Sequence, residues 1–358
     1  MNRLYNLDYL RGLAAFGIMI FHYLSWTLGD PISMTSGIMG RIGIYGVSIF
    51  YVLSGLTLYY VYFNKMEPSK ADVIDFVKKR FFRIFPLLWL SIFGCIALTV
   101  ILKVDIEGPL PDFKKVFLNV TGLFGLIDWN SYIAPGSWSI GNELVFYIFF
   151  PFFILFTRKS KVTMIILSVI LLVIYLYFAF YILDPAKPIK AQWANYVNPL
   201  NQVFLFLSGF LMGYTFHSIK IGRAFNLLIL FFGLGLFIFY PVTGNPILLA
   251  TGLNRIIFTI SCFAICLGFY KLDIKFPAII NKPLALLGEA SYSVYLLHAL
   301  VYIMVGAIFA VFSKHFFYVP ESVKLIVAVA GTVGLSYFVY ENFEKYFMKM
   351  AKKKTVQL

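Results

Sequence analysis

LDYLRGLAAFGIMIFHYLSW, residues Leu7 to Trp26, is the stretch of sequence that decides the fold. About 20 mostly apolar residues make a helix long enough to span a lipid bilayer. Arg11 and His22 interrupt this stretch about three helical turns apart, so both side chains lie on nearly the same helix face, about 16 Å apart along the axis. An ionisable residue within a membrane span is costly and faces the protein interior or a water-filled cavity. The stretch therefore predicts a membrane helix with one polar stripe.

Two interpretations of this stripe stay open. In the first, Arg11 and His22 line a polar path with a proton acceptor deep in the membrane. In the second, the helix is a signal anchor with a snorkelling Arg and a His at the far interface. No small-residue cleavage site follows the apolar run, so we expect a retained first span and not a cleaved signal peptide.

The composition indicates an integral membrane protein. Of 358 residues, 61% are hydrophobic and only 13% are charged, and the mean hydropathy is +0.84, which excludes the soluble globular class. Helical runs without alternating ten-residue segments argue against a β-barrel. We expect an all-α integral membrane protein with about ten transmembrane helices, forming a single domain over residues 1–358 with no appended soluble domain. The expected spans are 7–28, 41–63, 80–103, 138–157, 162–182, 198–216, 224–240, 251–270, 285–312 and 323–347.

The net charge of +14 is a topology signal and does not indicate nucleic-acid binding. With a cytoplasmic N-terminus, the inner segments and their flanks hold 19 of the 30 Lys and Arg residues, and the outer ones hold six. This is the positive-inside pattern, with both termini cytoplasmic. We expect a multi-pass protein of the cell inner (cytoplasmic) membrane, with a short basic tail from Lys352 to Leu358.

Small residues within the spans predict close helix packing. Gly43, Gly46 and Gly55 lie in the second span, and later spans carry Gly209, Gly213, Gly233 and Gly235. The three cysteines, Cys95, Cys262 and Cys266, all lie in apolar stretches and form neither a disulfide framework nor a metal-ligand cluster. We expect no metal cofactor.

A cluster of cations, KKRFFRIFP, occupies residues 78–86 at the expected start of the third span. Arg80 and Arg83 are three residues apart and therefore adjacent on a helix. Anchoring by anionic lipid headgroups explains the cluster. A phosphate clamp explains it equally, because Arg offers planar, bidentate donors to phosphate.

The sequence SWSIGNELVFY, residues 137–147, follows a long outer segment, 104–137, that contains carboxylates and aromatics. That segment either receives a carbohydrate or is a solvated lid. Ser139, Glu143 and Tyr147 repeat every four residues and so lie on one helix face. Glu143 and His22 are both expected in the outer half of the membrane. A carboxylate beside a buried His is a general-base arrangement, whereas a structural pair or a capping Glu is the alternative.

The later spans hold three further polar features. Arg255 lies within a span and faces an unknown partner. Ser291, Tyr295 and His298 lie on one stripe of the ninth span, either as an interhelical contact or as part of a site. Glu341 and Glu344 lie at the inner boundary of the last span, in the sequence YFVYENFEKYFMKM.

Taken in order, these motifs resemble the acyltransferase 3 family of multispan membrane proteins, which includes O-antigen and exopolysaccharide O-acetyltransferases. The similarity rests on Arg-x10-His in LDYLRGLAAFGIMIFH, then GVSIFYVLSG, the Arg-x-x-Arg of KKRFFRIFP, SWSIGNELVFY and SYSVYLLH. It extends over nearly the whole chain. Two departures are the absence of Glu-x-Pro from the terminal EKYFMK and of the C-terminal hydrolase-like domain that many relatives carry.

The resemblance implies transfer of an acyl group, usually acetyl, from cytoplasmic acetyl-CoA to a hydroxyl of an outer-facing glycan. The acceptor is a cell-surface polysaccharide or a lipid-linked saccharide in the membrane, and no nucleic acid takes part. His22 would be the base, with Glu143 orienting it or positioning the acceptor; an acyl-His intermediate is an alternative route. The residues expected to bind acetyl-CoA are Arg11, Lys79, Arg80 and Arg83. The residues expected to bind the acceptor are Trp138, Ser139, Asn142, Tyr147, Tyr292 and His298.

Two other classes of protein would share some of these features. A proton-coupled transporter would also place Arg, His and Glu on shared intramembrane faces, although no inverted repeat or pair of broken helices is apparent. A purely structural or lipid-anchoring membrane protein does not explain three separate polar stripes.

Overall fold

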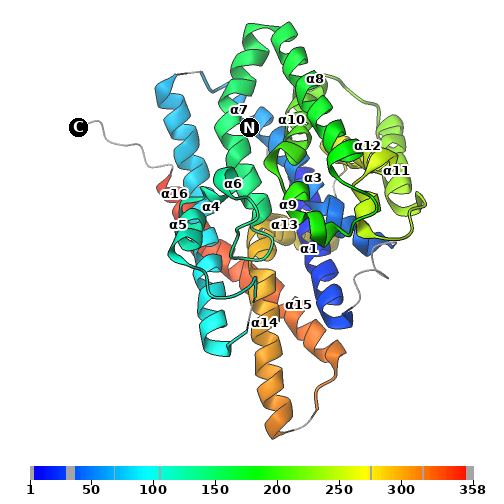
Figure 1. Cartoon of the computed structure of the whole chain (residues 1–358). Helices are drawn as coiled ribbons and strands as arrows, with labels where there is room; N and C mark the ends of the chain where they lie inside the picture. The colour runs from blue at the N-terminus through cyan, green and yellow to red at the C-terminus, as the bar shows by residue number, and fades with distance from the viewer. Residues whose placement is uncertain are drawn as a thin grey trace. The chain divides into compact units, whose positions relative to one another are not determined.

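The computed structural model describes residues 4–29, 37–67, 69–104, 106–274, 276–316 and 318–351, and these residues contain helices and no strand (Figure 1). Most of the first outer loop, Asp105 and the basic tail from Lys352 lie outside the described residues. The chain divides into two compact units that alternate along the sequence. The first comprises Met1–Met66 and Ile148–Gly288, and the second comprises Glu67–Tyr147 and Glu289–Leu358.

Each of the ten expected spans coincides with a helix. The helices are α1 (Tyr5–Leu28), α3 (Ile38–Tyr62), α4 (Lys70–Leu102), α7 (Trp138–Lys159), α8 (Lys161–Tyr177), α10 (Pro199–Phe216), α11 (Arg223–Phe239), α12 (Gly252–Tyr270), α14 (Ser291–His315) and α15 (Glu321–Val339). Shorter helices are α5 (Phe113–Thr121), α6 (Phe124–Ile127), α9 (Trp193–Tyr196), α13 (Ala278–Glu289) and α16 (Lys345–Met350). A π-helical turn, Tyr340–Glu344, joins α15 to α16, and another, Phe178–Ile182, extends α8.

Seven of the helices formed by the described residues are long and apolar enough to cross a membrane. Of the ten expected spans, α1, α10 and α11 are helical but are not among these seven. The chain is thus an all-helical protein with multiple membrane-crossing candidates.

Two predicted boundaries were wrong. The third span was expected to start at residue 80, but α4 starts at Lys70, where the Ser69 hydroxyl accepts the Asp72 amide and caps the helix. Arg80 and Arg83 therefore lie well inside α4 and not at its start. The ninth span was expected to run from residue 285, but Ala290 breaks the helix between α13 and α14.

In the first unit, α3 and α10 cross with their backbones in contact. A Cβ atom added to Gly55 would lie 2.0 Å from the Phe206 carbonyl oxygen, and one added to Gly209 would lie 2.0 Å from the Val52 oxygen. Only glycine permits this approach, as small residues do in membrane helix pairs.

The other glycines that were predicted to pack in these spans also lie close to neighbouring side chains, with one exception. A Cβ atom on Gly213 would meet Tyr59, and one on Gly233 would meet Ala264 where α11 packs on α12. These two helices lie side by side (Figure 1). The prediction for Gly235 was wrong: nothing lies within 4 Å of its Cβ position, because it faces away from the neighbouring helices.

Two buried arginines hold the first unit together. Arg41 donates to the carbonyl oxygens of Phe237, Ile238 and Tyr240, each at 2.7 Å, at the C-terminal end of α11. A cation there complements the helix dipole. Arg255, whose partner was unknown from the sequence, donates to the Asn201 carbonyl oxygen at 2.9 Å.

In the second unit, α14 packs on α4 and on α15. Ser91 in α4 donates to the Leu296 carbonyl oxygen, 3.1 Å away. The expected outer segment 104–137 contains α5 and α6, and Asp112 caps α5 by accepting the Lys115 amide at 2.7 Å. One of the carboxylates in that segment is thus a helix cap.

Candidate active site

Arg11 lies in the first unit, within a fixed set of polar contacts. Its Nη1 atom is 2.7 Å from the Asp8 carboxylate, one turn earlier in α1. Its Nη2 atom donates to the Leu53 carbonyl oxygen at 3.2 Å and to the Thr57 hydroxyl, both on α3. The Arg11 side chain keeps 22% of its surface exposed. Arg11 is thus oriented by α3 and retains an accessible edge.

His22 lies on the same continuous helix, α1, so the expected shared face with Arg11 is present. The imidazole is half-buried. It stacks on Trp26, one turn later, with ring centroids 5.1 Å apart and an interplanar angle of 21°. Trp26 is 41% exposed. The stack restricts rotation of the imidazole and leaves it near a surface.

Glu143 and Tyr147 lie in the second unit, one turn apart on α7. The Tyr147 hydroxyl donates to the Glu143 carboxylate, which confirms that the two residues share a helix face. The Arg80 guanidinium lies 5.7 Å from the Tyr147 ring centroid and 5.9 Å from that of Phe76. Cation–π contact of this kind orients a guanidinium.

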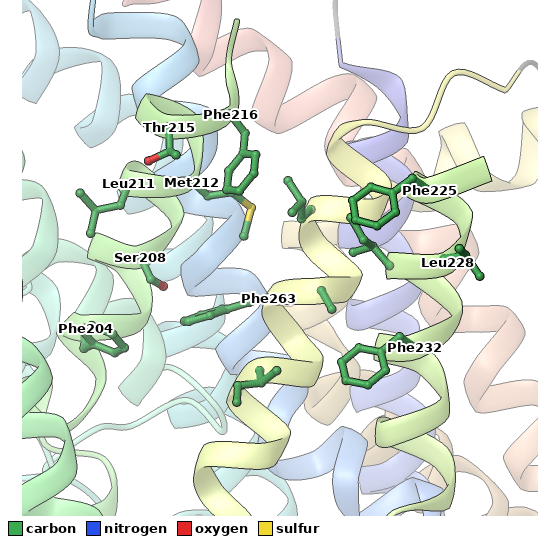
Figure 2. Close-up of a pocket in the computed structure, with 14 residues that line it drawn as sticks. Phe204, Ser208, Leu211, Met212, Thr215, Phe216, Phe225, Leu228, Phe232 and Phe263 are labelled. Carbon is green, nitrogen blue, oxygen red and sulfur yellow. The ribbon is translucent and has the colours of Figure 1, made fainter. Parts of the chain in front are cut away.

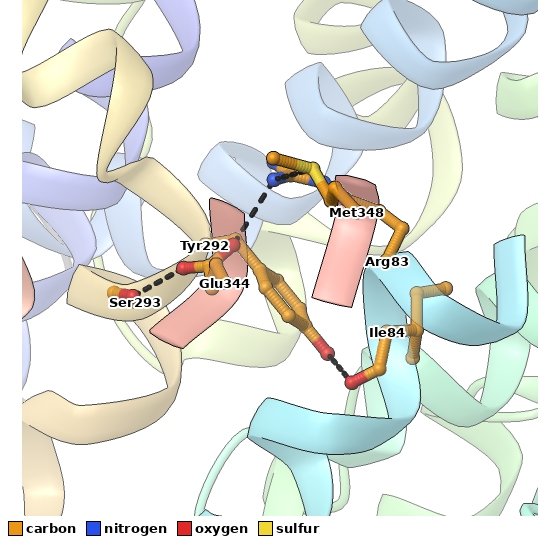
Figure 3. A network of polar contacts seen from close by, with 6 residues as sticks. All are labelled: Arg83, Ile84, Tyr292, Ser293, Glu344 and Met348. Atoms are coloured by element: carbon orange, nitrogen blue, oxygen red, sulfur yellow. Dashed lines mark hydrogen bonds and ion pairs between the residues drawn. The ribbon is translucent and has the colours of Figure 1, made fainter. Parts of the chain in front are cut away.

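Arg83 belongs to a buried ionic network (Figure 3). Its Nη1 atom is 3.0 Å from the Glu344 carboxylate in the π-helical turn after α15. The Ser293 hydroxyl donates to the other oxygen of Glu344. Glu344 is 3% exposed, so it is a buried carboxylate held by one cation and one hydroxyl.

Tyr292 lies beside this network. Its ring lies 5.7 Å from the Arg83 guanidinium, and its hydroxyl donates to the Ile84 carbonyl oxygen at 2.9 Å (Figure 3). Tyr292 therefore contacts both the Arg83 guanidinium and the backbone of α4.

A second cluster of polar contacts lies at the start of α7. The hydroxyls of Ser139 and Tyr295 are 2.8 Å apart, and both donate to the Gly136 carbonyl oxygen. Gly136 has a φ of +79°, a left-handed conformation that favours glycine. This turn fixes the first residues of α7 against α14.

The remaining predicted site residues of the second unit differ in exposure. Trp138, Asn142 and His298 are buried. The His298 Nδ1 atom lies 2.7 Å from the Tyr295 carbonyl oxygen, one turn earlier. Lys79, in contrast, lies at the surface and pairs with Asp75 at 2.5 Å.

The structure thus gathers the predicted site residues into two groups. Arg11 and His22 lie on α1 in the first unit, and the other predicted residues lie in the second unit. Within the second unit, Arg83 meets Tyr292, and Arg80 meets Tyr147.

Sequence reasoning missed several supporting residues. Thr57, Ser293 and the pairing role of Glu344 were not anticipated. Each contacts a residue at least 46 positions away in the chain, and no local spacing marks such a contact.

Comparisons with known proteins agree with this architecture. Residues 4–341 match the family model described as an acyltransferase domain, that of acyltransferase 3. A curated protein of Rhizobium radiobacter, "Protein 2 in picA locus", is 29% identical over 154 residues, which cover 39% of this chain and 76% of the relative. No solved structure matches the chain. Because the family model spans nearly the whole chain, the protein belongs to the acyltransferase 3 family.

Proposed function

We propose that the protein is a membrane O-acyltransferase that uses cytoplasmic acyl-CoA, in the simplest case acetyl-CoA, to acylate a hydroxyl of a cell-surface glycan or of its lipid-linked precursor. The proposal includes ten spans, two cytoplasmic termini and placement in the inner membrane. Its main support is α1, on which Arg11 and the half-buried His22 share one face of an unbroken helix. Membership of an acyltransferase family supports the reaction class.

In this proposal, cations hold the donor. Arg80 and Arg83 bind the phosphates of acyl-CoA together with Lys79, and Arg11 binds the donor near the inner end of α1. The Arg83 guanidinium has five N–H donors, and 31% of its side-chain surface is exposed, so its pairing with Glu344 leaves donors for a phosphate.

The chemical step is a transfer from sulfur to oxygen. His22 removes the proton of the acceptor hydroxyl as its oxygen attacks the thioester carbonyl carbon. The C–O bond forms, the C–S bond breaks, and the proton passes to the leaving thiolate to give free CoA. Glu143 orients the His22 ring or positions the acceptor, a general-base arrangement. Trp138, Ser139, Asn142, Tyr147, Tyr292 and His298 are proposed to shape the acceptor site.

The test is release of free CoA from acetyl-CoA by the purified protein in the presence of membrane glycolipid extract. Loss of general-base catalysis lowers a rate by about 10²- to 10⁴-fold, and we expect His22→Ala to show a loss in this range. Expression and thermal unfolding should stay those of the wild type. Glu143→Gln should lower the rate less than His22→Ala does.

If His22→Ala released CoA at the wild-type rate, His22 would not be the base. A second readout separates an enzyme from a transporter: acetyl-CoA should raise the unfolding temperature of the wild type, because a ligand at 100 times its Kd stabilises by about 2.7 kcal/mol. The combined change Arg80→Ala and Arg83→Ala should abolish this shift. Absence of any acetyl-CoA effect on the wild type would favour a transporter.

A further inference from the structure

An apolar groove lies on the first unit, and none of the predicted site residues lines it. Its walls are α10 and α11, and its floor is α12, with Phe216 and Phe225 facing each other across one end (Figure 2). The groove has a volume of about 710 Å³, within the size range of small-molecule sites. Packing explains it: α10 packs mainly on α3 and α11 on α12, which leaves the space between α10 and α11 open.

The lining of the groove is apolar and faces outward. Phe225 is 62% exposed, Leu228 is 65% exposed and Phe232 is 57% exposed. Ser208, one of the few polar residues in the lining, already donates its hydroxyl to the Leu205 carbonyl oxygen. A polar ligand would therefore find few partners here, whereas a hydrocarbon chain would remove apolar surface from contact with mobile lipid.

The length of the groove corresponds to one bilayer leaflet. Along α10, the lining extends from Phe204 to Phe216, about 18 Å at 1.5 Å per residue. Half of a hydrocarbon core is about 15 Å thick. One acyl chain can therefore lie along the groove from the membrane interface to near the midplane.

The interfacial end of the groove carries positive charge, which we call the basic mouth: Lys220, Arg223 and Lys271. Lys220 lies in the α10–α11 connection, and Arg223 starts α11; both are exposed. Lys271 donates to the Ile219 carbonyl oxygen at 2.9 Å and so fixes that connection.

Lys220 and Arg223 have no acidic residue near them in the sequence, whereas Lys271 has Asp273 two residues later. The chain contains no Asp or Glu between Asp184 and Asp273. Among the described residues, none of the ion pairs involves the basic mouth. An anionic headgroup is thus the complement of the mouth, and an acyl chain is the complement of the groove.

We propose that the groove and the basic mouth together bind one anionic phospholipid, with its phosphate at Lys220 and Arg223 and one acyl chain between α10 and α11. The site does not depend on the proposed transferase activity. A lipid held there would seal the space between α10 and α11.

The test uses the full-length protein, delipidated in mild detergent and titrated with phosphatidylglycerol or with phosphatidylcholine of the same acyl chains. Native mass spectrometry counts the bound lipids. We expect one phosphatidylglycerol per chain, bound at least about tenfold more tightly than phosphatidylcholine. The double variant Lys220→Gln with Arg223→Gln should weaken phosphatidylglycerol binding by about 30-fold, since each cation near an anionic surface contributes about fivefold.

A matched control and a groove variant make the result specific. Lys187→Gln with Lys190→Gln removes the same charge from two exposed positions of the same unit, outside the groove, and should leave binding unchanged. Thr215→Trp places a large side chain in the groove from an exposed position and should weaken binding with the basic mouth intact.

Three outcomes would overturn the proposal. Equal binding of the two lipids, or an equal loss in the control pair, would show nonspecific annular contact. Unchanged binding by Thr215→Trp would show that charge alone holds the lipid. A dimer that forms when lipid is removed, and that Thr215→Trp prevents, would assign the groove to a second copy of the chain.

Discussion

Two cations on α4, Arg83 and Lys79, show how surroundings decide the role of a side chain. Arg83 pairs with Glu344, whose side chain is only 2% exposed, whereas Lys79 pairs with Asp75, whose side chain is 51% exposed. Breaking a buried ion pair leaves an unpaired charge in a medium of low polarity, while an exposed pair is replaced by water.

We therefore predict that Arg83→Ala lowers the free energy of unfolding by about 2 kcal/mol, less than for a fully buried pair because Arg83 is partly exposed. Lys79→Ala should change it by less than about 0.5 kcal/mol. Thermal unfolding in detergent measures both. Equal effects would mean that the Glu344 carboxylate is hydrated when Arg83 is absent. Combining Arg83→Ala with Glu344→Gln should restore part of the loss.

At the scale of single residues, sequence reasoning succeeded where both partners lie on one helix. The shared face of Arg11 and His22, and that of Glu143 and Tyr147, follow from helical periodicity alone. The contact of Arg11 with Thr57 depends on how α1 packs against α3, and that packing has no signal in local spacing.

Among the helices, the crossing of α3 and α10 leaves no room for a side chain at either of its two glycines. Gly55 and Gly209 allow each backbone to contact the other, and a Cβ atom at either position would overlap a carbonyl oxygen. Gly55→Ala should therefore force the helices apart and lower the free energy of unfolding by about 2 kcal/mol, as overpacking does.

Gly235→Ala is the matched control. It is also a helical glycine, but nothing lies within 4 Å of its Cβ position. The change should stabilise α11 by up to about 1 kcal/mol, the difference in helix propensity. Thermal unfolding of both variants checks the pair. Destabilisation by Gly235→Ala similar to that by Gly55→Ala would mean that the effect comes from helix propensity and not from the crossing.

The loop before α5 should respond to pH through Glu107. Partial burial beside Cys95 and Ile133 raises the pKa of Glu107 from 4.5 to about 7, and the charge of Lys115 opposes this rise. The Glu107 carboxyl group loses its proton near pH 4.5 when the loop is unfolded, and keeps it up to about pH 7 when the loop is folded. The contribution of Glu107 to the stability of the folded loop is therefore fully present below pH 4.5 and is lost as the pH rises through 7.

Hydrogen exchange of residues 106–121 at pH 5 and pH 8, corrected for the intrinsic rate, measures this effect. We expect about 1 kcal/mol less protection at pH 8, a value reduced for the solvent exposure of Glu107. Glu107→Gln should remove the difference, and Glu321→Gln, an exposed acid at the start of α15, should leave it in place. A difference that persists in Glu107→Gln would assign the pH response to another group.

Element positions were more predictable than element ends. Apolar runs located all ten helices because a span must be long and apolar. The start of α4 was missed because five of its first ten residues are charged and lie before the apolar run, although Ser69 marks the cap. The break at Ala290 was missed because the sequence around it continues the helical pattern without Gly or Pro at that position.

For the whole molecule, the number of crossings decides which side each loop faces. Within the described part of the chain, seven helices have the length and composition of spans, and α10 and α11 are not among them. Two cations lie on each side of α10: Lys187 and Lys190 precede it, in a segment predicted to be outside, and Lys220 and Arg223 follow it, in a segment predicted to be inside. If α10 crosses the membrane, Lys187 and Lys220 lie on opposite sides; if it does not, they lie on the same side.

Single cysteines at these two positions test this point. The three native cysteines are buried, so the wild-type protein serves as the unlabelled background. A membrane-impermeant maleimide added outside intact spheroplasts should label Lys187→Cys and not Lys220→Cys, while permeabilised cells should allow both to react. Labelling of both, or of neither, in intact spheroplasts would contradict a crossing by α10. Labelling of both would also place the basic mouth outside, where the positive-inside rule does not predict a cluster of cations.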